Sequence, residues 1–195
     1  MASQKQNIIY LLRDGFDYYG NDMTGGIHFS FPENLVKDLD VLDRQGLKEA
    51  IKVYINQSQI TPGNYIITLS EHIYFEKDFS SVAIDQQDAI VQQYVETVPF
   101  ENSLSKIFPI ENGFKVIVIN RDLCFALQEA FGEKGFVVDA ISPVLVLGQT
   151  LSGGENGLSA DSIRLLFEKY AMLKQNSFPI QTSVAEKSPS LEKPQ

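Results

Sequence analysis

Few residues of this 195-residue chain have the type and spacing that catalysis or metal binding requires. His28 and His72 are the only histidines, and neither lies at metal-ligand spacing from a cysteine, a carboxylate or another histidine. Cys124 falls in the apolar register of an expected helix, which indicates a core thiol rather than a nucleophile. We therefore interpret all three as structural or surface residues.

Two carboxylate pairs, Asp14 with Asp17 and Asp38 with Asp40, are close enough in sequence for acid–base chemistry. On an acidic chain such side chains are more often solvated. The stretch LSGGENG at 151–157 looks like the signature of ABC-type ATPases, which acts only beside a phosphate-binding loop and an acidic metal-binding strand. The sequence contains no GxxxxGK[ST], GxSxG or HExxH motif, so we interpret 151–157 as a flexible link.

The composition indicates a globular protein without a nucleic-acid or membrane function of its own. Hydrophobic residues make up 44% of the chain, the net charge is -9 and the pI is about 4.7, and no basic run offers a partner for nucleic acid or anionic lipid. A single cysteine excludes an internal disulfide and suits a reducing compartment. The sequence has no signal-peptide pattern at its start and no apolar stretch of about 20 residues. We expect a soluble cytoplasmic protein.

The elements that position these residues follow from hydrophobic periodicity and turn residues. A hairpin is expected around Asp14-Gly15, and helices are expected at 44–56, after Asp85, at 121–131 and from Ser159. Further strands are expected at 27–31, 64–70, 73–80, 114–120 and 136–141, with a polar connection at 31–45 and a short buried helix within 142–151. The strand, helix and strand between 114 and 141 predict a βαβ unit with parallel pairing.

The stretch YVETVPF at 94–100 is expected to be a structural corner. Pro99 lacks an amide hydrogen and disfavours helical geometry at Val98, so the preceding helix should end there. Tyr94 and Phe100 are expected to pack across the corner.

In their order, these segments resemble the N-terminal half of PilM-type proteins of type IV pilus assembly and, more distantly, the cytoplasmic part of GspL-type secretion proteins. The resemblance covers roughly residues 7–150 and rests on the opening hairpin, FPENLVKDLDVLDRQGLKEAIKVYI before ITPGNYIITLSEHIYFEKDF, and VIVINRDLCFALQEAFGEKGFVVDAISP. In the family a helix ends in a tyrosine, a proline–phenylalanine pair comes after a short gap, and a βαβ unit ending in GF-VDAI-P follows. The matching residues here are Tyr94, Pro99, Phe100, Gly135, Phe136, Val138, Asp139, Ala140, Ile141 and Pro143.

The resemblance implies an α/β fold, namely one actin-like (ribonuclease H-like) half with a mixed sheet. It implies a domain over residues 1–150, with a small subdomain inserted at about 71–112. After this domain we expect an amphipathic helix at 158–177 and a disordered tail at 178–195.

Actin-like ATPases hold phosphate with an opening hairpin of the form D-x-G-[ST], and this chain departs from it. The corresponding turn contains Asp14, Gly15, Phe16 and Asp17, so it lacks the hydroxyl and places a carboxylate where it would repel phosphate. The second phosphate hairpin and the adenosine pocket belong to a second half that 195 residues do not contain. We expect neither ATP binding nor hydrolysis, no catalytic residue, and no metal or cofactor.

The resemblance implies a cytoplasmic scaffold, peripheral at the inner membrane, that docks a short peptide or a domain of a pilus or secretion platform protein. Self-association stays open, and neither nucleic-acid binding nor membrane insertion of this chain is expected. One alternative is a divergent actin-like or sugar-kinase-type ATPase that completes its site by dimerisation. Another is an unrelated small α/β interaction module.

Overall fold

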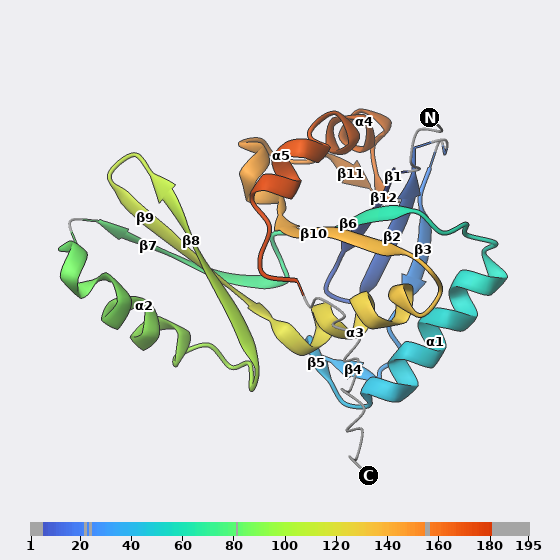
Figure 1. Cartoon of the computed structure of the whole chain (residues 1–195), viewed down its shortest axis with the longest axis horizontal. Helices are drawn as coiled ribbons and strands as arrows, with labels where there is room; N and C mark the ends of the chain where they lie inside the picture. Colours follow the sequence, from blue (N-terminus) through green and yellow to red (C-terminus); the bar gives the residue numbers. More distant parts are fainter. Residues whose placement is uncertain (1–5, 22, 24, 81, 155–156, 181–195) are drawn as a thin grey trace, which may run out of the picture.

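The structure, a computed structural model, describes residues 6–21, 23, 25–80, 82–154 and 157–180. Its main sheet has five strands in the order β10-β6-β1-β2-β3 (Figure 1). The strands β1, β2 and β3 are antiparallel, whereas β6 and β10 run parallel to β1. This is the ribonuclease H-like mixed sheet, so the expected fold class is confirmed. The strands are β1 (Gln6–Leu11), β2 (Gly15–Gly20), β3 (Ile27–Ser30), β6 (Asn64–Leu69) and β10 (Val137–Pro143).

Helices cover both faces of the main sheet (Figure 1). One face carries α1 (Arg44–Gln57) and α3 (Arg121–Gly132), and the other carries α4 (Ala160–Glu168) and α5 (Tyr170–Gln175). Successive side chains of a strand point to opposite faces. Accordingly Ile9 packs toward α1 and α3, whereas its neighbour Ile8 packs toward α4 and α5. The near-continuous apolar run of β1 is thus explained by burial on both sides.

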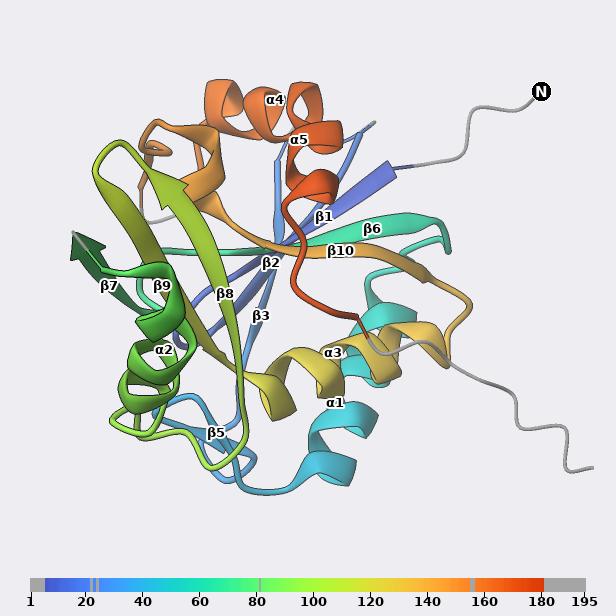
Figure 2. The ribbon, with the colours of Figure 1, turned by 60° about the vertical axis from the view of Figure 1, so that its left-hand side comes forward.

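A second, three-stranded antiparallel sheet has the order β7-β9-β8 and is built from β7 (Tyr74–Ser80), β8 (Ser103–Ile110) and β9 (Gly113–Asn120). The helix α2 (Gln87–Val95) covers it (Figures 1 and 2). This second sheet extends to Asn120, whereas the subdomain was expected to end near 112.

The predicted βαβ unit between 114 and 141 is wrong. The strands β9 and β10 lie in different sheets, and the parallel partner of β10 is β6. The apolar run of β9 has another cause, because Val116 and Val118 pack in the cluster beneath α2 while Ile117 and Ile119 pack in the main core. A strand whose two faces are buried in two different cores has the same continuous apolar sequence as a central strand of a parallel sheet.

Helix termini agree with the sequence where a cap is used. The side chains of Asn120 and Ser159 accept hydrogen bonds from the amides of Leu123 and Ser162, as expected for N-caps. The expected cap Asp85 is wrong, since it lies in a 3₁₀ turn, Ile84–Gln86, that precedes α2.

The region expected as one helix at 158–177 contains two helices that meet at Lys169. The break lets Tyr170 and Leu173 of α5 pack against the sheet residues Ile66 and Ala140. A 3₁₀ helix, Val144–Leu147, replaces the short helix expected within 142–151. The glycine-rich link forms a small ladder, β11 (Gly153–Gly154) with β12 (Gly157–Leu158), and the polar connection contains β4 (Val36–Lys37) and β5 (Asp40–Val41).

Residues 178–180 are part of the fold, so the expected start of a disordered tail at 178 is wrong. Phe178 is only 2% exposed, and its amide donates a 2.7 Å hydrogen bond to the carbonyl oxygen of Ile141 in β10. Its ring lies 6.4 Å from that of Phe108 in β8. The Phe178 ring is buried between the main sheet and β8 of the second sheet, and this burial fixes the segment in place. Figure 2 shows the segment running from α5 across β10. Residues 181–195 lie outside the described part of the chain.

The corner at 94–100 packs on β7. The helix α2 ends at Val95, earlier than expected, and the chain turns before Pro99 is reached. The ring of Tyr94 lies 5.9 Å from that of Phe79, and the ring of Phe100 lies 5.3 Å from that of Phe75. Both aromatic residues thus fix the corner to one strand.

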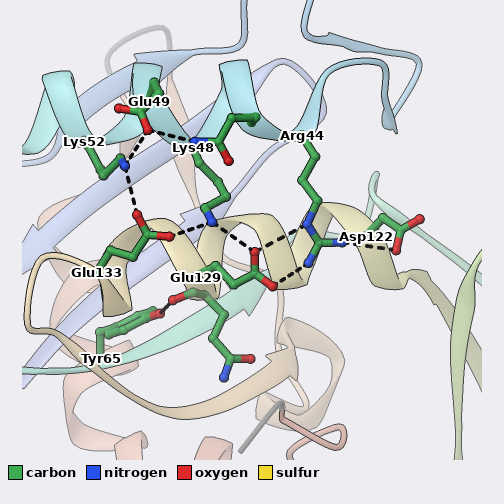
Figure 3. A network of polar contacts seen from close by, with 10 residues as sticks. Arg44, Lys48, Glu49, Lys52, Tyr65, Asp122, Glu129 and Glu133 are labelled. Atoms are coloured by element: carbon green, nitrogen blue, oxygen red, sulfur yellow. Dashed lines mark hydrogen bonds and ion pairs between the residues drawn. The ribbon is translucent and has the colours of Figure 1, made fainter. Parts of the chain in front are cut away.

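An ion-pair network joins α1 to α3 on the surface (Figure 3). Successive turns of α1 present cations, and α3 presents carboxylates opposite them. The closest contacts are 2.6 Å for Arg44–Glu129, 2.6 Å for Lys48–Glu133 and 2.8 Å for Lys52–Glu133. The complementary charges hold the two helices together, and we call this ion-pair network the α1–α3 clamp.

None of the helices in the described part of the chain combines the length and the apolar character that a membrane span requires.

Candidate functional site

A cleft of about 810 Å³ opens at the carboxyl ends of the parallel strands β1, β6 and β10. Ligands of open α/β sheets bind outside this end of the strands. Leu12 and Asp14 follow β1, whereas Ser70, Glu71 and His72 follow β6. The other side of the cleft is lined by Thr150, Leu151, Gly153, Gly157 and Leu158. Two segments far apart in sequence, the opening hairpin and the glycine-rich link, therefore meet here.

Part of a row of polar residues forms the floor of the cleft, and the row crosses the whole main sheet. The strand register aligns one polar side chain from each of the five strands. This polar row consists of His28, Asp17, Tyr10, Thr68 and Ser142. The adjacent row on the same face is apolar except for one hydroxyl and consists of Tyr19, Ile8, Ile66 and Ala140. Along this face the side chains change from apolar to polar toward the end of the sheet where the cleft lies, and Asp17, Thr68 and Ser142 of the polar row are still buried.

Asp17 is the most interconnected member of the polar row. Its side chain is buried, and its Oδ1 lies 2.8 Å from Nδ1 of His28. Its Oδ2 accepts a 3.0 Å hydrogen bond from the hydroxyl of Tyr19, which in turn accepts a 3.0 Å bond from the amide of Leu158. Gly157 has a φ of +98°, and a Cβ there would lie 3.1 Å from Asp17 Oδ2. The ladder β11–β12 thus closes directly onto Asp17.

Nε2 of His28 lies 3.0 Å from Oγ of Ser30, which extends the chain of contacts from Asp17. The order Ser30–His28–Asp17 is that of a serine hydrolase triad. Ser30, however, lies in the edge strand β3 and not on a sharp strand-to-helix turn, where helix amides would form an oxyanion hole. We assign these contacts the structural role of fixing the His28 ring.

Three hydroxyl groups near the cleft are buried without a hydrogen-bond partner in the described part of the chain. They belong to Thr68 and Ser142 of the polar row and to Ser70, which lines the cleft. Buried hydroxyl groups in proteins almost always have partners. The carboxyl ends of β6 and β10 therefore offer hydrogen-bonding capacity that the described residues do not use.

The cleft is acidic. Asp14, Asp17 and Glu71 line it, and no lysine or arginine is among its described lining residues. Burial and then the nearby carboxylates of Glu71 and Asp17 raise the pKa of Tyr10 to about 12. No cluster of three His, Cys, Asp or Glu side chains among the residues described has the geometry of a metal site. The arrangement favours a cationic group over phosphate.

The side chains of the opening turn, which was compared with the phosphate hairpin, point to different faces of the sheet. Asp14 is exposed at the cleft and Asp17 lies in its floor, but Phe16 points to the opposite face, where its ring stacks on Phe29 at 5.0 Å. A Cβ on Gly15 would collide with the carbonyl oxygen of Phe29, so this glycine serves strand packing.

Sequence reasoning did not identify the cleft. His28 and His72, interpreted as structural or surface residues, both line it, and Ser70 and Glu71 were not considered. The available signal was the polar pair that directly follows the apolar strand at 64–69.

The residues that carry the resemblance occupy structural positions. Gly135 has a φ of +85°, which glycine adopts freely. Burial by itself would raise the pKa of Asp139, but hydrogen bonds from Lys174 (2.9 Å), Asn64 (3.0 Å) and Tyr170 (3.0 Å) together lower it. Pro143 ends β10. Cys124 is buried, as expected of a core thiol.

No sequence family matches the chain, and no curated protein matches it. The structure is similar to a solved PilM–PilN type IV pilus biogenesis complex, with a TM-score of 0.51 and 13% identity over 73% of this chain. The chain spans about half (48%) of that protein's length.

Two weaker similarities also exist. One is to the cytoplasmic domain of EpsL, an inner-membrane component of the type II secretion system of Vibrio cholerae, with a TM-score of 0.42, 13% identity, and coverage of 77% of this chain and 60% of that one. The other is to a Bacteroides thetaiotaomicron protein of unknown function with an actin-like ATPase fold, with a TM-score of 0.36, 16% identity, and coverage of 70% and 52%.

Proposed function

We propose that this chain is a non-catalytic scaffold of a type IV pilus or type II secretion-like assembly platform, acting at the cytoplasmic side of the inner membrane. It would dock a peptide or domain of a membrane component. The observation that carries the proposal is the shared fold with the protein in the PilM–PilN complex, over 73% of this chain. Fold likeness alone does not transfer function, so the site must supply the rest.

The site supports a role without nucleotide chemistry. Phosphate binding needs amides, hydroxyls or cations aimed at the anion. Here Phe16 lies in the core, and the cleft carries the carboxylates of Asp14, Asp17 and Glu71 without a lysine or arginine among its described lining residues. Carboxylates that line the cleft would repel a triphosphate.

In-cell crosslinking tests the docking role. The full chain, with a photoreactive residue at an exposed position, is expected to crosslink to an inner-membrane pilus or secretion platform protein in its native cells. Recovery of no such protein would contradict the proposal. Calorimetry with ATP and Mg²⁺ is expected to give no heat of binding, and a micromolar affinity would contradict the expectation that the chain does not bind ATP.

The alternative is an ATPase that completes its site by dimerisation, and one observation favours it: Asp14 survives from the phosphate turn and lines the cleft. In that case the Asp14→Asn variant would lose a measurable ATP turnover that the unmodified chain shows. The scaffold proposal expects no turnover in either protein.

A further inference from the structure

Two carboxylates at the mouth of the cleft have no described counter-charge. Asp14 and Glu71 are exposed, and within the described residues no ion pair involves either of them. Asp17 adds a buried carboxylate in the floor, whose oxygens face the hydroxyl of Tyr19 and the ring of His28. A concave site lined by one sign of charge concentrates ions of the opposite sign.

Unpartnered hydroxyl groups provide a second, independent observation at the same place. Ser70 is only 2% exposed, lines the cleft, and has no partner for its Oγ in the described structure. Thr68 and Ser142 behind it are buried in the same way. Hydroxyl and carboxylate oxygens can all accept hydrogen bonds. A lysine ammonium group, which has three hydrogen-bond donors and no acceptor, matches such a set of oxygens.

We propose that the cleft at the carboxyl ends of β1 and β6 binds a lysine side chain of a basic peptide segment, with Glu71, Asp14 and the hydroxyl of Ser70 as acceptors. The opposite wall is formed by Thr150, Leu151 and Leu158 together with Gly153 and Gly157, and the two glycines leave part of this wall without side chains. The identity of the segment rests on the proposed scaffold function. Cytoplasmic flanks of transmembrane helices are enriched in lysine and arginine, so a docked membrane component would present such a segment.

A pair of peptides with the same sequence but different charge tests the proposal. The full chain, labelled with ¹⁵N, is titrated with a capped nine-residue peptide of alanine and serine that carries two lysines, and with the same peptide after acetylation of both lysines. The lysine peptide is expected to shift the amide resonances of Ser70, Glu71 and Gly157. Its affinity should fall as NaCl is raised, because salt screens exposed charges. The acetylated peptide is expected not to bind.

Variants of the cleft locate the effect. Asp14→Asn and Glu71→Gln are each expected to weaken binding of the lysine peptide by about two- to fivefold, the range of a partly exposed ion pair. Ser70→Ala should weaken it as well. The matched control Glu111→Gln, exposed at the turn between β8 and β9, should leave affinity unchanged. Equal binding of both peptides, or shifts confined to other regions, would overturn the proposal. So would the same shifts produced by MgCl₂ alone without peptide binding, which would indicate an inorganic cation site.

The in-cell crosslinking separates this inference from the proposed function. If the chain captures a platform protein and Glu71→Gln captures it equally, the scaffold role stands and the lysine site is wrong. If the lysine peptide binds the cleft but no platform protein is captured, the site stands and the scaffold role is wrong.

Discussion

The amide of Phe178 donates a 2.7 Å hydrogen bond to the carbonyl oxygen of Ile141, on the outer edge of the main sheet. Because β10 pairs with β6 on its other side, this bond covers a free strand edge, and the hydroxyl of Ser177 accepts a 3.0 Å bond from the amide of Ile141. The chain after α5 is therefore part of the folded unit.

Replacing Phe178 with alanine is expected to lower the free energy of unfolding by about 3–5 kcal/mol, the usual cost of deleting a fully buried aromatic ring. Urea denaturation followed by circular dichroism measures it. Pro179→Ala, at an exposed neighbour, serves as the control and should change the stability little. Equal midpoints for Phe178→Ala and the unmodified chain would show that the segment does not pack as described.

Phe100→Ala is expected to destabilise the chain more modestly, by about 1–2 kcal/mol, because the ring is half-buried against Phe75. The loss should appear as a lower melting temperature. An unchanged melting temperature would contradict the structural role of the corner at 94–100.

Acid is expected to weaken the α1–α3 clamp through Glu133. Hydrogen bonds from Lys48 and then Lys52 lower the pKa of Glu133 to about 2, from an ordinary value near 4.5. A lowered pKa in the folded state contributes stability that is complete above the unfolded value and is lost as the pH falls from about 4.5 toward 2. Unfolding free energies of the unmodified chain and of Glu133→Gln should therefore converge across that window, and more salt should narrow the gap at pH 7. A pH-independent difference would contradict this.

Tyr19→Phe removes the hydroxyl that links Asp17 to the amide of Leu158. The variant is expected to lose about 1 kcal/mol of unfolding free energy, the net contribution of a typical hydrogen bond, and the β11–β12 ladder should be the part that is destabilised. Hydrogen exchange at Leu158 should accelerate more than exchange at Leu123, whose amide is capped by Asn120. Uniform acceleration at both amides would indicate global destabilisation instead.

Cys124 is expected to be unreactive in the folded chain. Burial raises the pKa of its thiol to about 12, and the thiolate is the reactive form. Iodoacetamide at pH 8 should leave the native chain unmodified and alkylate the chain in urea, as measured by mass spectrometry. Rapid alkylation of the native chain would place the thiol at the surface.

Local patterns in the sequence were sufficient for most elements. The helix expected at 44–56 is observed as Arg44–Gln57, and the caps Asn120 and Ser159 act as predicted. These features depend on neighbours within a few residues. The strand at 113–120 was predicted in the wrong sheet. Its sequence indicates that both faces are buried but does not indicate which elements cover those faces.

The sequence by itself determined the α/β class, which follows from hydrophobic periodicity, and the absence of serine and threonine from the opening turn, which follows from residue type. The mixed sheet was implied only by the family resemblance. Only the tertiary structure decided that His28, Asp17, Tyr10, Thr68 and Ser142 form one row. Their alignment results from strand register between segments as far apart in sequence as Thr68 and Ser142, set by packing of the whole sheet. The acidic cleft arises in the same way, from loops that the parallel strands bring to one edge.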